Sequence, residues 1–414
     1  MAVSNKLADW NIRSLDELHL SGRRVLLRVD FNTPLDEDDE VADDARIVAA
    51  LPTIRAIQER GGRVIACSHL GRPKGKRVAK YSLEPVARRL AELLDTEVLL
   101  PDDCVGEAAQ HLVANQRAGQ VVLLENLRFH PGETDNGEDF ARKLADLAEI
   151  YVNDAFGALH RAHASVDALP RLMPDRCAGL LVARELAFLA PLVSGAEAPY
   201  VAILGGAKIS GKIDVIERML ESVNALIIGG AMANTFIAAM GHDMGDSLLE
   251  ADRIPIARHL IQRCEDKGIC LFLPIDHVVT DEISADAVGT VVARGAIGPG
   301  RQAVDIGPET VALFCRVLDG SAPGMETPPR TVFWNGPMGV FEIDAFANGT
   351  MALARSLARS SATTVIGGGD SAAAVRKAGV TELVSHVSTG GGASLEFLGG
   401  AALPGLAALR GGRR

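Results

Sequence analysis

Short apolar runs alternate with longer segments of helical apolar spacing along the whole chain. In the first half, runs of strand length begin near residues 23, 63, 97, 120 and 150. Segments such as 47–57 and 84–94 lie between them with apolar residues at helical intervals, and Pro52 is expected near the first turns of its helix. Strands that alternate with helices predict an α/β fold built on parallel sheets.

The second half repeats this alternation, with glycine at most strand ends. Strands are expected at 201–204, 225–228, 270–273, 331–334 and 363–366. The apolar stretch 223–240 contains Asn224, Gly229, Gly230, Asn234 and Thr235, which predicts a buried strand, a turn and a helix start rather than a membrane span. A helix over 178–193 would join two domains, and 414 residues suit two domains of about 150 to 200 residues each.

Composition narrows the class of protein. Hydrophobic residues make up 48% and charged residues 23%, as in globular proteins, and the net charge of -11 argues against nonspecific nucleic-acid binding. The six cysteines show no CxxC spacing, so we expect reduced thiols, a cytoplasmic setting and no zinc site. The first ten residues lack the pattern of a secretory signal.

Arginines follow the strand ends of the first half. Arg46, Arg72, Arg128 and Arg161 each lie in the segment after a predicted strand. The carboxyl ends of parallel strands share one edge of the sheet, so these guanidinium groups should converge on an anion. The acidic stretch 36–44 and the basic stretch 74–80 are interpreted as solvated loops, and the histidines at 160 and 163 as hydrogen-bonding groups rather than metal ligands.

The midpoint of the chain has the composition of a phosphate cradle. Residues 199–214 read PYVAILGGAKISGKID, a strand that ends in two glycines before Lys208 and Lys212. Their i, i+4 spacing predicts one face of a helix, and a helix N-terminus offers free amides to an anion. The segment fits GxxxxGK, but Ile213 stands where a P-loop needs Ser or Thr, which disfavours a standard P-loop. Taken alone, the segment also fits a strand-turn-helix junction with two solvated lysines.

A second glycine-rich junction, GGGDSAAA at 367–374, also runs from a strand into a helix. Its amides suit a phosphate and Asp370 suits a hard cation, but it lacks the GxGxxG of a Rossmann dinucleotide site.

Eight segments that occur in order along nearly the whole chain closely resemble the phosphoglycerate kinase family: RVDFNTP, SHLGRP, ENLRF, NDAFGALHRAH, GGAKISGK, WNGPMGVFE, GGGDS and STGGGASLE. The resemblance implies two doubly wound parallel-sheet, Rossmann-like α/β domains that face a cleft and are joined by an interdomain helix. It divides the chain into a 3-phosphoglycerate domain (1–177), a hinge helix (178–198), a nucleotide domain (199–388) and a hinge with a tail that returns to the first domain (389–414).

The resemblance also implies an activity and its residues. The enzyme would move a phosphoryl group reversibly between 1,3-bisphosphoglycerate and MgADP, in glycolysis and gluconeogenesis, as a hinge-bending cytoplasmic monomer without nucleic-acid or membrane partners. Residues implied for 3-phosphoglycerate are Asp30, Asn32, Arg46, His69, Leu70, Gly71, Arg72, Arg128 and Arg161. Residues implied for the nucleotide are Gly206, Ala207, Lys212, Gly230, Asn335, Glu342, Gly368, Gly369, Asp370 and Ser371, with Asp370 also the ligand of Mg²⁺. Residues implied around the transferring group are Arg46, Lys208, Lys212, Gly367 and Gly390.

The chain departs from the family pattern at a few positions. Gly211 stands where many members carry an acidic residue, Ala231 replaces a glycine, and Ala158 with Leu159 replaces a small or hydroxylated pair. One rival function is a nonenzymatic sugar-phosphate or nucleotide sensor, which is disfavoured because Arg46 and Lys208 are both present. The other is a Rossmann dehydrogenase, which is disfavoured by the missing fingerprint.

Overall fold

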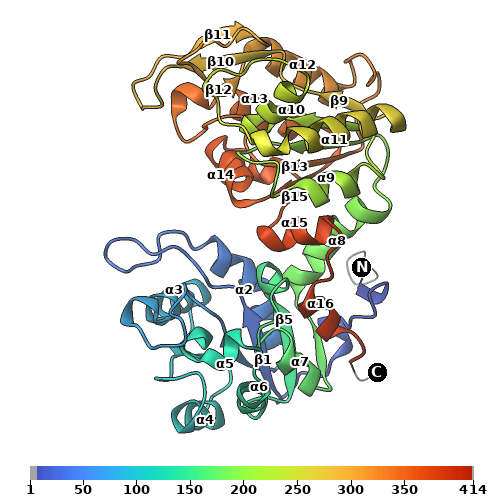
Figure 1. The fold of residues 1–414 in the computed structure, drawn as a ribbon. Helices are drawn as coiled ribbons and strands as arrows, with labels where there is room; N and C mark the ends of the chain where they lie inside the picture. The colour runs from blue at the N-terminus through green and yellow to red at the C-terminus, as the bar shows by residue number, and fades with distance from the viewer. Residues whose placement is uncertain (1–6, 413–414) are drawn as a thin grey trace. The chain divides into compact units, whose positions relative to one another are not determined.

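A computed structural model describes residues 7–412, which divide into two compact units (Figure 1). The first unit contains residues 7–187 and 402–412, and the second contains residues 188–401. Each unit has its own six-stranded sheet. The α/β class expected from the alternating pattern is confirmed.

The sheet of the first unit is parallel throughout, in the order β3-β4-β2-β1-β5-β6. Its strands are β1 (Arg24–Val29), β2 (Arg63–Cys67), β3 (Val98–Leu99), β4 (Val121–Leu123), β5 (Ile150–Asp154) and β6 (Arg176–Ala178). Its α-helices are α2 (Ala45–Glu59), α3 (Glu84–Leu94), α4 (Glu107–Ala114), α5 (Pro131–Thr134), α6 (Glu138–Ala145), α7 (Ala168–Leu172) and α16 (Pro404–Leu409). Short 3-10 turns are η1 (Leu15–Glu17), η2 (Ala79–Tyr81), η3 (Leu127–Phe129) and η4 (Phe156–Ala158). Helix α8 (Leu180–Ser194) continues from this unit into the next.

Burial explains why the first sheet forms. Five consecutive residues of β1, from Val25 to Val29, are fully buried, as expected for a parallel strand covered on both faces. Val25 and Leu27 belong to a core cluster with Ile47 and Ile54 of α2. The apolar side of that helix therefore covers one face of the strand.

Pro52 differs from its expected position, because it lies in the middle of α2 rather than in the first turns. A proline there removes one backbone hydrogen bond to the residue four positions earlier. Pro52 is exposed, and Val48 is 44% exposed, so the carbonyl left without its helical donor lies on the solvent side of the helix.

The second unit holds another parallel sheet, ordered β15-β14-β13-β7-β8-β9. Its strands are β7 (Tyr200–Leu204), β8 (Ala225–Ile228), β9 (Cys270–Phe272), β13 (Thr331–Asn335), β14 (Thr363–Gly367) and β15 (His386–Val387). Its α-helices are α9 (Ile213–Met219), α10 (Gly230–Ala239), α11 (Ile254–Lys267), α12 (Pro308–Asp319), α13 (Asn348–Arg359), α14 (Gly369–Lys377) and α15 (Gly392–Leu398). Its 3-10 turns are η5 (Ala251–Arg253), η6 (Asp344–Phe346) and η7 (Thr381–Leu383).

A small antiparallel sheet in the second unit was not predicted. It pairs β10 (Asp276–Thr280) with β11 (Thr290–Ala293) and with β12 (Gln302–Ile306). Three of the four residues of β11 are exposed, so this strand lacks the apolar run that marks a buried strand. The stretch 223–240 forms β8 and α10 as predicted, and no described helix is both long and apolar enough to cross a bilayer.

Both sheets have a point where the direction of strand order reverses. Strand β1 lies between β2 and β5, and strand β7 lies between β8 and β13. Open α/β sheets bind ligands beyond the carboxyl ends of the strands at such a point. A ligand site is therefore expected at the segments after β1, β5, β7 and β13.

Candidate active site

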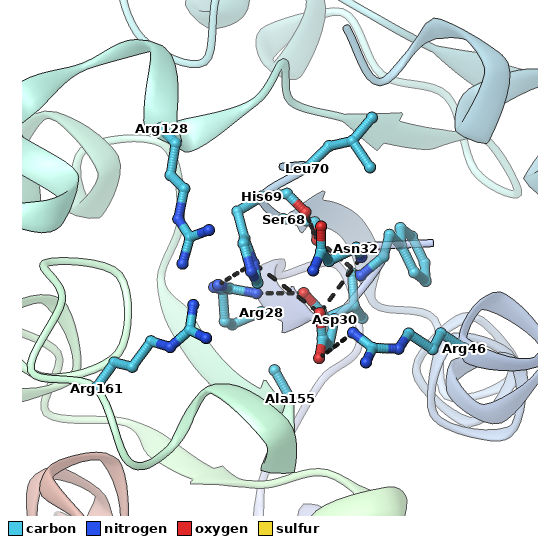
Figure 2. Close-up of polar contacts among 12 residues, drawn as sticks. Arg28, Asp30, Asn32, Arg46, Ser68, His69, Leu70, Arg128, Ala155 and Arg161 are labelled. Atoms are coloured by element: carbon cyan, nitrogen blue, oxygen red, sulfur yellow. Dashed lines mark hydrogen bonds and ion pairs between the residues drawn. The ribbon is translucent and has the colours of Figure 1, made fainter. Parts of the chain in front are cut away.

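The first unit brings several of the predicted residues together at the carboxyl edge of its sheet (Figure 2). The side chains of Arg46, Arg128 and Arg161 point from three different segments toward the space around Asp30 and His69. Arg46 lies in the first turn of α2 and Arg128 lies in η3, so each is held by an element that follows a strand. The expected convergence of these three guanidinium groups is present.

Short polar contacts fix the loops of this cluster. Nη1 of Arg46 lies 2.9 Å from Oδ2 of Asp30. The Asn32 side chain accepts a hydrogen bond from the backbone N–H of Gly71 at 2.8 Å, and Nη1 of Arg128 donates to the Gly71 carbonyl at 2.7 Å. Gly71 has φ +59°, and a Cβ there would lie 2.4 Å from the Tyr81 ring, so this position requires glycine.

The other two residues predicted in this loop differ in exposure. Leu70 is 3% exposed, and its carbonyl accepts a hydrogen bond from the Asn126 side chain at 2.7 Å. Arg72 is exposed, and its charge adds to the effect of burial, which lowers the pKa of Arg161. Arg72 therefore belongs to the rim of the cluster.

The cluster concentrates positive charge. Burial, together with the charges of Arg161 and Arg28, lowers the pKa of Arg128 to about 10. Burial also lowers the pKa of Arg161, opposed by Asp30. Cations that lower one another's pKa are stabilised when an anion binds among them. The site is thus suited to a small, multiply charged anion.

Arg28 was missed by the sequence analysis. It lies in the middle of β1, is fully buried, and hydrogen-bonds to the His69 ring from below. A charged residue inside the apolar run VLLRV was the signal that could have identified it, because a buried cation requires partners. His69 itself is only 3% exposed.

The histidines at 160 and 163 and a possible metal cluster lie in the same unit. Nε2 of His160 lies 3.1 Å from Nε of Arg161, and Nδ1 of His163 lies 3.8 Å from Oε1 of Glu133. Among residues 7–412, the ligand atoms of Asp103, Cys104 and His130 lie within 4.8 Å of one another. Burial raises the pKa of the Cys104 thiol well above its usual value, which disfavours the thiolate that would bind a metal.

The second unit presents a cradle of backbone at the carboxyl ends of β7, β8 and β13. Gly206 has φ +98° and Gly230 has φ +63°. A Cβ on Gly230 would lie 2.6 Å from the Gly206 nitrogen and 2.8 Å from the Pro337 carbonyl. Three loops therefore approach too closely for a side chain, which leaves backbone groups to line the surface.

The predicted helical face with Lys208 and Lys212 is wrong. Helix α9 begins only at Ile213, so both lysines precede it. Nζ of Lys212 instead turns back to the carbonyls of Gly205 at 2.6 Å and Asn335 at 3.0 Å. The preceding segment is anchored by the buried side chain of Ile209 and by the hydrogen bond from Ser210 Oγ to Glu250, which together hold it as a loop.

Lys212 and Lys208 have different surroundings. Lys208 is exposed in the loop. Burial lowers the pKa of Lys212 to about 8, although the charge of Asp370 opposes this shift. Lys212 is therefore a cation that a bound phosphate would stabilise.

A pocket of about 290 Å³ opens beside this cradle. Five residues predicted for the nucleotide line it: Gly206, Ala207, Gly230, Glu342 and Asp370. Residues that the sequence analysis missed also line it, among them His277, Asp305 and Met338. The first two come from the small antiparallel sheet, which was not predicted.

The remaining predicted residues lie at the junctions around β13, β14 and β15. Asn335 ends β13, Gly367 ends β14, and Gly368, with φ +87°, leads into Gly369 and Asp370 at the start of α14. The Ser371 hydroxyl accepts a hydrogen bond from the Gly336 N–H at 2.6 Å, so part of its hydrogen-bonding capacity is used within the protein. The Gly390 N–H donates to Ser388 Oγ at 3.1 Å.

Comparisons with known proteins agree along nearly the whole length. A family model described as Phosphoglycerate kinase matches residues 15–401. The phosphoglycerate kinase of Chlorobium limicola is 52% identical over 400 residues, covering 96% of this chain and 99% of that protein. The Chlorobaculum tepidum enzyme is 52% identical over 401 residues, with coverage of 96% and 99%.

Solved structures are similar as well. The phosphoglycerate kinase from Coxiella burnetii superposes with a TM-score of 0.85 at 39% identity, and that from Pyrococcus horikoshii with 0.81 at 32% identity. Each alignment covers 96% of this chain and 98% of the other.

Proposed function

Because this chain belongs to the phosphoglycerate kinase family, we propose that it transfers a phosphoryl group reversibly from 1,3-bisphosphoglycerate to MgADP, giving 3-phosphoglycerate and MgATP. The observation that carries the proposal is the group of guanidinium side chains that surrounds Asp30 and His69 at one sheet edge. A three-carbon acid with a phosphate and a carboxylate supplies the negative charges that such a cluster requires.

Each side of the reaction has its own set of residues. In the first unit, Arg46, Arg128 and Arg161 would bind the acid, with Asp30, Asn32, His69, Leu70, Gly71 and Arg72 completing its site. In the second unit, the glycine cradle and Lys212 would bind the phosphates of the nucleotide, and the pocket of about 290 Å³ would take its sugar and base. Lys208, Gly367 and Gly390 would approach the transferring group.

The chemistry requires no general base. In the forward direction the attacking oxygen belongs to ADP, and in the reverse direction it belongs to the carboxylate of 3-phosphoglycerate. Both oxygens are already ionised at neutral pH. Catalysis then depends on in-line positioning and on neutralisation of the charge that spreads over the phosphoryl oxygens. Arg46 and Lys212 carry charges of the required sign.

A divalent cation fits the donor set at the start of α14. Asp370 is exposed there and lines the nucleotide pocket, and a carboxylate oxygen is a ligand that Mg²⁺ prefers. Asp370 would hold the ion together with phosphate oxygens of the nucleotide. When bound, Mg²⁺ offsets phosphate charge during transfer.

We further propose that the reaction depends on hinge closure. Arg46 and Lys208 belong to different units, and both are proposed to act on the same phosphoryl group. The bending points would be helix α8 and the segment near residue 389. Closure also excludes water, which would otherwise hydrolyse the acyl phosphate.

The experiment that tests the activity is ATP formation by the purified protein from ADP and 1,3-bisphosphoglycerate, with Mg²⁺ supplied. Turnover supports the kinase. Binding of both ligands without turnover would instead support a sensor, and NADH binding with no ATP formed would support a dehydrogenase. We also propose a cytoplasmic monomer of glycolysis, and light scattering on the eluting protein checks its mass.

A further inference from the structure

A chain of buried polar side chains lies beneath the arginine cluster. Arg28, Glu133 and Ser165 are all fully buried. Nε of Arg28 donates to Ser165 Oγ at 2.9 Å, and that hydroxyl donates to Oε1 of Glu133 at 2.7 Å. The Ser165 backbone N–H donates to Oε2 of the same carboxylate at 2.9 Å. A single hydroxyl therefore links a buried cation to a buried anion.

These contacts fix the orientation of the Arg28 guanidinium. Nε is held by Ser165 and Nη1 by the carbonyl of Val29, so Nη2 is directed at Nδ1 of His69, 3.1 Å away (Figure 2). An arginine side chain can only donate hydrogen bonds. Nδ1 of His69 must therefore be the acceptor, which excludes a proton on that nitrogen.

We infer that Arg28 is a positioning residue that holds His69 as the neutral tautomer with its proton on Nε2. A neutral imidazole with Nδ1 as an acceptor carries its one N–H at Nε2. That N–H is then oriented to donate to an oxygen of the anion bound by the arginines. This inference rests on the proposed function for the identity of the anion, 3-phosphoglycerate, but not for the state of the ring.

The charges that face His69 favour the same state. Burial, followed by the charges of Arg28, Arg128, Arg161 and His163, lowers the pKa of His69 well below its usual value. The acidic group that faces the ring is Asp30, whose Oδ1 lies 4.0 Å from Nδ1 and favours protonation. Three arginines and burial outweigh one carboxylate, so the ring stays neutral at physiological pH.

Nuclear magnetic resonance of the full chain with ¹⁵N-labelled histidine tests the tautomer directly. Long-range ¹H–¹⁵N correlations distinguish a protonated ring nitrogen from a bare one, and His69→Gln identifies the signals. We expect a bare Nδ1 and a protonated Nε2, unchanged between about pH 6 and pH 8. A protonated Nδ1, or a titration midpoint within that interval, would overturn the inference.

Variants test the role of Arg28. Arg28→Met removes the donor, so His69 should become a mixture of tautomers. KM for 3-phosphoglycerate should rise about tenfold, whereas kcat and KM for ATP should change about twofold or less. Arg28→Lys keeps a donor and should restore part of the difference. Since loss of a buried cation can impair folding, Ser165→Ala serves as a second variant, because it keeps Arg28 but removes the anchor of Nε. It should shift both readouts in the same direction by a smaller amount.

Arg60→Gln is the matched control. Arg60 donates to the carbonyls of Leu15 and Leu18 in the same unit, so its loss affects loop packing without contact to His69. It should leave the tautomer and KM unchanged. If Arg28→Met and Ser165→Ala raise KM while the His69 signals stay as in the wild type, Arg28 does not act through the ring and the inference fails.

The NMR readout needs no turnover. A protein with the expected tautomer but no ATP formation would contradict the proposed function alone. An active kinase with a proton on Nδ1 would contradict this inference alone.

Discussion

Cations of the candidate site are held where burial makes their charge costly. The pKa of Arg128 falls to about 10 and that of Lys212 to about 8, chiefly because both are removed from water. An anionic ligand would offset that cost. Binding and protonation are therefore coupled at the scale of single residues.

Arg46→Ala should reduce turnover more than affinity. Arg46 already has an ion-pair partner in Asp30 at 2.9 Å, and we propose that its guanidinium acts mainly on the transition state. We expect kcat to fall about 100-fold, as when one transition-state donor is removed, and KM for 3-phosphoglycerate to change about threefold or less. Steady-state kinetics measure both. Arg55→Ala, on the same helix but bonded to the Leu93 carbonyl, is the control, and equal losses in kcat and affinity would make Arg46 a ground-state binder.

ADP binding should take up a proton through Lys212. Above about pH 8 the free lysine is neutral, whereas a bound phosphate favours the ammonium, so affinity should fall as pH rises through the pKa of the free protein. The limiting slope is about tenfold per pH unit for one proton. Calorimetry at about pH 8.5 in buffers of different ionisation enthalpy counts the protons. Lys212→Met should abolish the uptake and Lys208→Met should not; the same proton count in Lys212→Met would refute this assignment.

Single residues differed in how well the sequence predicted them. Arg46, Arg128 and Arg161 follow strand ends, and parallel topology alone brings them to one edge. Arg28 was missed because its segment was interpreted only as a strand. Candidate ligand residues were sought after the strand ends, not within the strands. The two lysines were placed on a helix because spacing alone does not show where a helix begins; the buried Ile209 and the contact of Ser210 with Glu250 decide that.

At the scale of elements, strand ends and the turns after them make the site. Parallel strands with continuous apolar runs were predicted almost to the residue, for example β8 at residues 225–228. The strands β10, β11 and β12 were not, because they are short and β11 is largely exposed. Part of the proposed nucleotide pocket depends on β10 and β12, so its lining was only partly predictable.

Gly230→Ala should disrupt the proposed phosphate cradle. The new Cβ would lie 2.6 Å from the Gly206 nitrogen, against backbone that cannot rotate away. We expect ADP affinity to fall about tenfold or more, which corresponds to about 1.4 kcal/mol or more. Gly241→Ala, at the other end of α10, has φ +94° but open space around the Cβ, so it controls for backbone strain alone. Calorimetric titration compares the two variants, and equal affinities would argue against close approach as the cause.

The start of α8 should make stability depend on pH. Asp154 ends β5 and accepts hydrogen bonds from the N–H groups of Leu181 and Val182. Burial raises the pKa of Asp154 to about 7, although these hydrogen bonds lower it. The folded state keeps a proton that the unfolded chain loses between about pH 4 and pH 7, so this carboxyl contributes stability that is lost as pH rises through that window. The slope is at most about 1.4 kcal/mol per pH unit.

Asp154→Asn should flatten this dependence in the first unit. Urea unfolding at about pH 5 and about pH 7 measures the pH dependence of stability. The fluorescence of Trp10, in a Trp334→Phe background, is the signal that reports unfolding of the first unit. Asp305→Asn removes a similar carboxyl, with a pKa of about 7, from the second unit and should leave the first unchanged. An unaltered slope in Asp154→Asn would contradict the raised pKa.

At the scale of the whole molecule, the proposed machinery is divided. Arg46 belongs to the first unit and Lys208 to the second, so neither unit alone contains both groups proposed for the transferring phosphoryl. We therefore predict that 3-phosphoglycerate and MgATP together reduce the radius of gyration more than either ligand alone. Small-angle scattering measures this, and a radius that is unchanged with both ligands present would contradict hinge closure.

The return of residues 402–412 to the first unit affects how the protein is made. Helix α16 packs against α7 and β6, Leu406 and Leu409 are buried there, and the Gly405 N–H donates to the Leu159 carbonyl at 3.0 Å. The N-terminus of a chain leaves the ribosome first. Residues 188–401 therefore emerge as an uninterrupted segment before helix α16 is available to the first unit. The half that is translated first is thus completed only after residues 402–412 have been synthesised.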